Sequence, residues 1–270
     1  MSGLTINGLT DKKKNHTPIT MLTVYDYSIA SLVDKAGIDI ILVGDSLANV
    51  VLGLESTKSV GMNEMLYHAK AVRRAVKNAI LIGDMPYEAF QVNIEDSVKN
   101  AKRFIDEAGC DAVKLEWFDK CPDVTERIIK AGIPVMGHIG LTPQTADKLG
   151  GFKVQGKDAQ AAQKLIEQAV LLEGLGIFSL VLECIPTELG KLITKRINIP
   201  TIGIGAGLYC DGQVLVINDM LGLFDKYTPK FVKRYADLSG DIKKAVELFK
   251  YEVENHLFPT DEYSYIMKEK

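Results

Sequence analysis

Residues 111–118, Asp-Ala-Val-Lys-Leu-Glu-Trp-Phe, place a lysine and a glutamate inside what is otherwise the pattern of a short buried strand. Side chains of a strand alternate between its two faces, so Lys114 and Glu116 share one face with Ala112. This spacing leaves two explanations. Either the strand lies at the edge of its sheet and this face meets solvent, or both charged groups point into a site.

Polar residues also stand at the carboxyl ends of other short apolar runs in the sequence. They are Asp45, Ser46, Asp84, His138 and Glu183. The carboxyl ends of parallel strands meet at one edge, and adjacent strands lie ~4.8 Å apart. Asp45, Asp84 and Glu116 are therefore expected to reach a common point, with Lys114 and Glu183 on the same rim.

Carboxylates at such short distances repel one another and raise one another's pKa values. A bound divalent cation removes this repulsion. Ligands that are all oxygen favour Mg²⁺ or Mn²⁺ over zinc, because no cysteine and only one histidine is expected nearby. The sequence thus predicts a metal site formed by Asp45, Asp84 and Glu116, at which a chelating substrate can also bind.

Other features near these strand ends receive a structural interpretation. Asp26 lies between two tyrosines, which suggests packing, and Cys184 has no base or cation beside it in the sequence. Residues 203–207 lack the full glycine pattern of a dinucleotide loop and predict a tight turn. His138 is left open between structural hydrogen bonding and a place in the site. The glycine-rich start of residues 150–157 suggests a mobile flap.

Eight short apolar runs position these residues. They cover residues 19–26, 38–46, 79–85, 111–116, 133–140, 178–185, 199–207 and 213–219. Helical segments separate them, for example 97–109 and 158–176, the second with Asp158 as its expected N-cap. Eight strands alternating with helices predict an α/β fold, a (β/α)8 TIM barrel with a C-terminal helical extension. A doubly wound open sheet is the alternative.

No linker rich in proline, glycine or serine divides the chain, which predicts one domain over residues 1–270. Residues 1–18 are expected to form an N-terminal arm, with the lysines at 12–14 in a solvated turn before the first strand. Residues 239–270 are expected to form a helix and a tail that pack outside the barrel.

The composition excludes several classes of protein. The 270 residues carry a net charge of −3, whereas a nucleic-acid-binding protein usually has a basic excess. No apolar run approaches the ~20 residues of a membrane span, and the N-terminus lacks the apolar core of a signal peptide. The four cysteines form no CxxC pair, which predicts reduced thiols and a cytoplasmic location.

Several longer blocks resemble one known family. They lie at residues 42–53, 83–90, 113–117, 137–144, 180–186, 202–216, 229–238 and 258–265, and include "LVGDSLANVVLG", "GHIGLTPQ" and "IGIGAGLYCDGQVLV". In this order they resemble the ketopantoate hydroxymethyltransferases. The resemblance runs from about Thr20 to Tyr265 and rests on long, specific blocks.

The resemblance implies a barrel enzyme of the phosphoenolpyruvate/pyruvate superfamily with one Mg²⁺ per subunit. The enzyme would transfer a one-carbon unit from 5,10-methylenetetrahydrofolate to 3-methyl-2-oxobutanoate through a Mg²⁺-stabilised enolate, giving 2-dehydropantoate for pantothenate and coenzyme A synthesis. A homodecamer, a pentamer of dimers, is also implied. The matching positions give metal ligands Asp45, Asp84 and Glu116, substrate contacts Asp45, Ser46, Asp84 and Lys114, and the proton acceptor Glu183. No folate-contacting residue is assigned.

The chain departs from the family pattern at two places. Glu88, Ala89 and Phe90 stand where Gly-Ser-Tyr is common, so two hydroxyl groups are missing, and Gly61 replaces a usual threonine. The metal and base positions are unaltered. A Mg²⁺-dependent 2-oxo-acid aldolase or lyase without folate is an alternative function, and a non-catalytic oxo-acid sensor is an alternative of another class.

Overall fold

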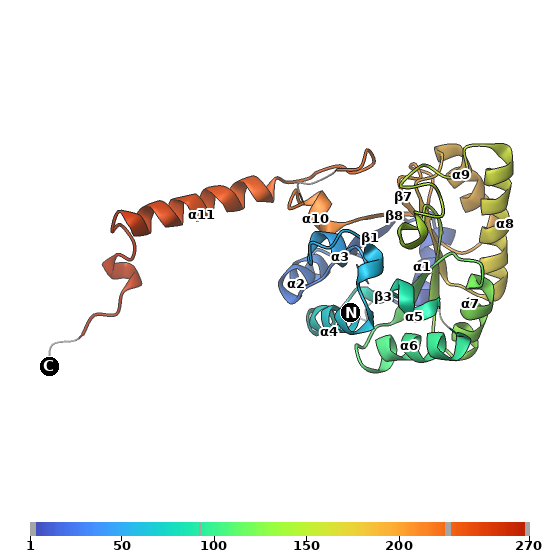
Figure 1. The fold of residues 1–270 in the computed structure, drawn as a ribbon, viewed down its shortest axis with the longest axis horizontal. Helices are drawn as coiled ribbons and strands as arrows, with labels where there is room; N and C mark the ends of the chain where they lie inside the picture. The colour runs from blue at the N-terminus through green and yellow to red at the C-terminus, as the bar shows by residue number, and fades with distance from the viewer. Residues whose placement is uncertain (1–3, 92, 225–227, 268–270) are drawn as a thin grey trace. The chain divides into compact units, whose positions relative to one another are not determined.

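The computed structural model describes residues 4–91, 93–224 and 228–267, and eight parallel strands form a closed barrel within them (Figure 1). The strands are β1 Ile19–Thr23, β2 Ile40–Val43, β3 Ile80–Asp84, β4 Ala112–Glu116, β5 Val135–Gly140, β6 Ser179–Glu183, β7 Thr201–Ile204 and β8 Gly212–Leu215. β1 pairs with both β2 and β8, which closes the sheet. The predicted TIM barrel is confirmed, and the open sheet is wrong.

Helices alternate with the strands along most of the chain. They are α1 Ile6–Lys14, α2 Tyr27–Lys35, α3 Leu47–Val50, α4 Met62–Ala75, α5 Tyr87–Phe90, α6 Ile94–Asp106, α7 Cys121–Lys130, α8 Ala159–Leu175, α9 Thr187–Arg196, α10 Ile217–Met220 and α11 Leu238–Glu254, with 3-10 turns η1 Thr57–Ser59, η2 Pro143–Thr145 and η3 Asp261–Tyr263. The predicted N-cap of α8 is confirmed, because the Asp158 carboxylate accepts a hydrogen bond from the Ala161 amide at 2.8 Å.

The inward faces of the strands form an apolar layer at the start of the barrel. Its members include the first residue of several strands, such as Ile19, Ile40, Ile80 and Ala112. Leu9 of α1 is fully buried in the same cluster. Helix α1 therefore packs against the amino ends of the strands, and the face that carries Ala112 points inward.

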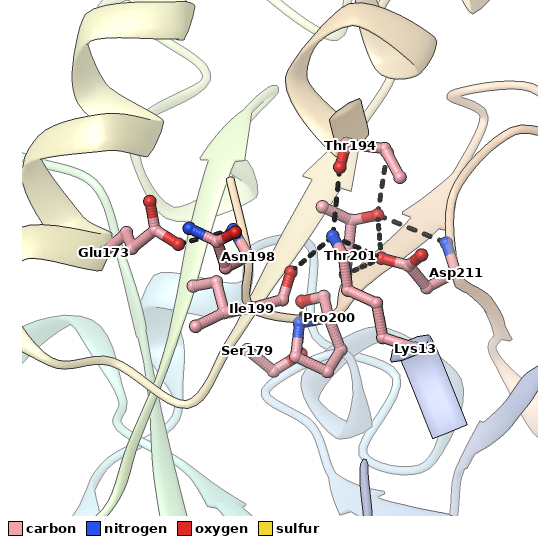
Figure 2. Close-up of polar contacts among 9 residues, drawn as sticks. All are labelled: Lys13, Glu173, Ser179, Thr194, Asn198, Ile199, Pro200, Thr201 and Asp211. Carbon is pink, nitrogen blue, oxygen red and sulfur yellow. Dashed lines mark hydrogen bonds and ion pairs between the residues drawn. The ribbon is translucent and has the colours of Figure 1, made fainter. Parts of the chain in front are cut away.

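The lysines of α1 correct one prediction, because they do not form a solvated turn. Thr5 caps the helix, and its last turn brings Lys12 to 2.6 Å from Asp39. Lys13 reaches Asp211 at 3.0 Å and donates hydrogen bonds to two backbone carbonyls, those of Thr194 at 3.0 Å and Ile199 at 2.8 Å (Figure 2). The helix end thus directs two of the three ammonium groups onto acids and carbonyls beside the strands.

Replacing Lys13 by Met is expected to lower the free energy of unfolding by about 2 kcal/mol, because a largely buried carboxylate and two carbonyls lose their cationic donor. Denaturant unfolding measures the change. Lys14→Met is the matched control, since the Lys14 side chain is 72% exposed and lies 3.9 Å from Asp11. Equal midpoints for the two variants would contradict this anchoring role.

The chain divides into two compact units, Met1–Ile217 and Asn218–Lys270. In the second unit, none of the described residues of α11 is buried. Its exposed apolar side chains Ile242, Val246, Phe249 and Val253 recur at helical spacing. Packing of this helix outside the barrel stays a prediction, and residues 268–270 of the predicted tail lie outside the described residues. Among the described residues, no helix combines the length and the hydropathy of a membrane span.

Candidate active site

Five polar side chains from four consecutive strand ends are buried together inside the barrel. They are Asp45 after β2, Asp84 at the end of β3, Lys114 and Glu116 in β4, and His138 in β5. Each is at most 5% exposed. Glu183, at the end of β6, joins them with 14% of its side chain exposed. Lys114 and Glu116 therefore point into a site, and the solvent-exposed edge explanation is wrong.

An ion pair occupies the centre of the site. Lys114 Nζ lies 2.9 Å from Asp84 Oδ1, and the Asp45 amide donates a hydrogen bond to Asp84 Oδ2 at 3.1 Å. Burial raises the pKa of Asp84 to about 7, although Lys114 opposes the rise. Burial alone would lower the pKa of Lys114, but Asp84, Glu116 and Asp45 together raise it. Lys114 is thus a fixed positive charge.

His138 lies between the two glutamates, which gives it a place in the site. Its Nδ1 lies 3.4 Å from Lys114 Nζ and 3.6 Å from Glu116 Oε1, and its Nε2 lies 3.2 Å from Glu183 Oε2. Burial lowers the pKa of His138 well below its usual value. Lysine offers only donors, so the neutral ring accepts at Nδ1 and carries its proton on Nε2, next to Glu183.

Two glutamates of the site have raised pKa values. Burial raises the pKa of Glu183 to about 8, with Lys114 opposing the rise. Burial likewise raises the pKa of Glu116 well above its usual value. A carboxyl group with a pKa near neutrality is suited to proton transfer at physiological pH.

The donor set fits a hard divalent cation in charge and chemistry. Four carboxylates, Asp45, Asp84, Glu116 and Glu183, face one ammonium group, Lys114, and burial raises the pKa of three of them. A divalent cation with oxygen ligands balances such an excess. In the described arrangement, however, no three of the described acidic, histidine or cysteine side chains lie close enough to hold one ion. Lys114 pairs with Asp84, and Gln144 donates hydrogen bonds to Asp45 and Glu116.

Gln144 and Tyr25 are site residues that sequence reasoning missed. Gln144 is fully buried, and its side-chain amide donates to Asp45 Oδ2 at 2.9 Å. The Tyr25 hydroxyl lies 2.8 Å from Ser46 Oγ. Both residues lie within a few positions of a strand end, and Gln144 also ends the block "GHIGLTPQ". Ser46 is half-buried at the rim, and its predicted substrate contact stays a prediction.

Two other strand-end features have structural roles, although packing was the wrong interpretation for Asp26, which is exposed. Asp26 is the N-cap of α2, where its carboxylate accepts a hydrogen bond from the Ile29 amide at 2.9 Å. In residues 203–207, Gly205 and Gly207 have positive φ angles, as a tight turn requires. The flap stays a prediction, although the Gln155 amide holds its end by donating to the Cys184 carbonyl at 2.8 Å.

Gly140 is the close neighbour of the Glu183 backbone. The two residues are paired in register between β5 and β6. Gly140 has a φ of 96°, and a Cβ atom at this position would overlap the Glu183 carbonyl oxygen. Leu141 donates its amide to that same oxygen at 2.9 Å. The backbone of the predicted base is therefore held by contacts that only glycine allows at position 140.

The departures from the family pattern have structural explanations. Ala89 and Phe90 are buried, and the Phe90 ring contacts Phe118 edge to face with centroids 5.2 Å apart. Apolar packing thus replaces the missing hydroxyl groups. Gly61 is the N-cap of α4, where its amide donates to the Glu64 carboxylate at 3.2 Å. Half of a capping box remains, so the loss of the threonine does not reach the site.

Comparisons with known proteins agree on one family. The family profile described as ketopantoate hydroxymethyltransferase matches residues 3–261. A 3-methyl-2-oxobutanoate hydroxymethyltransferase of Syntrophomonas wolfei subsp. wolfei is 54% identical, covering 100% of this chain and 98% of the relative. The enzyme of the same name from Syntrophus aciditrophicus is 51% identical over 97% of each chain.

Solved structures of low sequence identity share the fold. A phosphonopyruvate hydrolase in complex with oxalate and Mg²⁺ aligns with a TM-score of 0.62 at 11% identity, covering 97% of this chain and 92% of that one. A 2,3-dimethylmalate lyase, described as a PEP mutase/isocitrate lyase superfamily member, aligns with a TM-score of 0.62 at 12% identity. The alignment covers 98% of this chain and 93% of the lyase. These likenesses support the barrel architecture.

Proposed function

Because the chain belongs to the ketopantoate hydroxymethyltransferase family and is a hydroxymethyltransferase, we propose that its barrel site catalyses the transfer from 5,10-methylenetetrahydrofolate to 3-methyl-2-oxobutanoate. The observation that carries the proposal is the buried cluster of Asp84, Lys114, Glu116, His138 and Glu183. It combines a fixed positive charge with a carboxyl group of raised pKa, as proton removal beside a carbonyl requires.

Asp45, Asp84 and Glu116 would hold one Mg²⁺. When bound, the ion supplies a Lewis acid for the negative charge that develops on the keto oxygen of the substrate. The excess of buried carboxylates supports this assignment, as does the oxalate and Mg²⁺ named for the phosphonopyruvate hydrolase of the same fold.

The chain's own residues perform the other tasks. Lys114 attracts the substrate carboxylate and stabilises negative charge near the keto group. Glu183 removes the proton from C3, and His138 Nε2 lies 3.2 Å from its carboxylate. Ser46 contacts the substrate at the rim. C3 then forms a bond to the methylene carbon of the folate, both carbon–nitrogen bonds of that methylene group break, and water supplies the hydroxyl group, so that 2-dehydropantoate and tetrahydrofolate leave.

Exchange of the C3 proton tests the function. The ¹H NMR signal of 3-methyl-2-oxobutanoate is followed in D₂O with enzyme and Mg²⁺ but without folate. If the C3 proton signal is lost only when Mg²⁺ is present, the result supports an enolising site. If product forms only after 5,10-methylenetetrahydrofolate is added, the enzyme is the transferase and not an aldolase. If the oxo acid binds but neither its C3 proton exchanges nor product forms with folate, the result would favour the non-catalytic oxo-acid sensor.

Replacing Lys114 by Met is expected to weaken the binding of the oxo acid by roughly tenfold or more, because one buried charge-assisted contact is lost. Isothermal titration calorimetry with 3-methyl-2-oxobutanoate and Mg²⁺ measures the change. Lys99→Met, on the exposed face of α6, is the control. Unchanged binding and turnover in Lys114→Met would remove Lys114 from the mechanism.

The assembly and the compartment are further parts of the proposal. The exposed apolar stripe of α11 supports a role of that helix in subunit contacts, and a homodecamer is the expected state. Sedimentation measures it. The four free cysteines support a reducing, cytoplasmic compartment.

A further inference from the structure

Gln144 contacts the ends of three strands although it belongs to none of them. Its backbone amide donates to Glu116 Oε2 at 3.0 Å, and its side-chain Nε2 donates to Asp45 Oδ2 at 2.9 Å and to the Met85 carbonyl at 3.0 Å. Asp45 follows β2, Met85 follows β3 next to Asp84, and Glu116 ends β4. One residue therefore links the three strand ends that carry the proposed metal ligands.

The local structure explains why this residue has donors to offer. Gln144 lies in the 3-10 turn η2, directly after Pro143, and the turn is closed by the Thr145 amide and the Thr142 carbonyl at 2.9 Å. The first amides of a helical turn have no partner within it, so the Gln144 amide is available to Glu116. The side chain then extends into the site with no exposed surface.

Two acceptors fix the orientation of the side-chain amide. Nε2 has two hydrogens, and both are used by Asp45 and the Met85 carbonyl. A reversed amide would face its oxygen toward a carboxylate and a carbonyl, which is unfavourable. In the described orientation Oε1 is buried without a hydrogen-bond partner among the described residues. The side chain therefore satisfies the Asp45 carboxylate with its N–H group, while its own oxygen stays without a donor.

We propose that Gln144 is a positioning residue for the metal-binding carboxylates: it sets the distance between Asp45 and Glu116, and joins the β5–α8 loop to the ion site. The proposal rests on the proposed function, because it takes these carboxylates as metal ligands. β2 and β4 are not neighbours in the barrel, so no ladder hydrogen bond fixes these two side chains relative to each other. Groups that orient ligands from outside the metal shell typically change metal affinity about 10–100-fold when they are removed.

The test measures Mn²⁺ affinity without substrate, by electron paramagnetic resonance of free Mn²⁺, in the full-length protein. Gln144→Met keeps the length of the side chain but removes both side-chain donors, and roughly 10–100-fold weaker binding is expected. Gln144→Asn keeps the amide but is one methylene too short, so it should also bind weakly, and it serves if the Met variant does not fold. Gln163→Met, on the exposed face of α8, is the matched control.

Each outcome decides between the two proposals. Weaker Mn²⁺ binding by a folded Gln144 variant, with normal binding by Gln163→Met, supports the inference. If a folded Gln144→Met or Gln144→Asn variant binds Mn²⁺ within twofold of the wild-type affinity, the inference is overturned. The proposed function is then left intact. If the wild-type protein itself binds no Mn²⁺, the metal part of the proposed function fails and the inference fails with it.

Discussion

Replacing Glu183 by Gln is expected to slow exchange of the C3 proton by roughly 10²–10⁴-fold, because a positioned general base typically contributes that much. The amide has nearly the same shape, so the contacts around it are retained. The binding of metal and oxo acid is therefore expected to remain. NMR exchange in D₂O measures the rate, and calorimetry measures the binding.

Glu188→Gln is the matched control for this variant, since Glu188 is exposed in the first turn of α9. Its exchange rate should equal that of the wild type. Exchange by Glu183→Gln at the wild-type rate would show that another group removes the proton.

The pH dependence of exchange gives an independent check on Glu183. The base acts in its ionised form, and burial raises its pKa to about 8, so the rate should rise with pH through a midpoint near this value and level off above it. A bound cation favours the ionised form and moves the midpoint lower, toward the usual value of 4.5. A rate that falls over this range of pH would contradict the assignment.

The second large effect is expected for Gly140→Ala. The new methyl group would overlap the Glu183 carbonyl oxygen, and alanine is strained at a φ of 96°. The free energy of unfolding is expected to fall by about 3 kcal/mol, from the strain and the steric overlap together. Turnover is expected to fall by roughly 100-fold, because a displacement of about 1 Å at a catalytic group can have this effect.

Gly132→Ala separates the two causes. Gly132 has a φ of 82° but nothing within 4 Å of its would-be Cβ, so alanine there meets the backbone strain without the overlap. Its unfolding free energy should fall by about 1 kcal/mol, with turnover unchanged. Chemical denaturation and steady-state kinetics measure both variants. Equal losses for the two would mean that Gly140 does not hold Glu183 in place.

The eight strands and most of the site were predictable from the sequence for a physical reason. Strands covered on both faces must be apolar throughout, so a charged residue at the end of such a run is conspicuous. Barrel geometry then brings these ends together without knowledge of any loop. For this reason Asp45, Asp84, Lys114, Glu116 and Glu183 could be grouped before their distances were known.

The remaining features depend on contacts that no local pattern encodes. The importance of Gln144 depends on where the loop after β5 runs relative to β2 and β4. The role of His138 depends on the side chains that β4 and β6 supply beside it. The lysines at 12–14 have the composition of a solvated turn, and only the docking of α1 gives two of them partners.

The anchoring of α1 also has a consequence for the order of folding. Helix α1 precedes all eight strands in the chain, yet Lys13 bonds to carbonyls of α9 and of the segment before β7, 181 and 186 residues further along. On the ribosome, α1 must therefore wait, with Leu9 uncovered, until β7 and β8 have been made. Such distant contacts slow folding, and docking of this helix belongs with the final closure of the barrel.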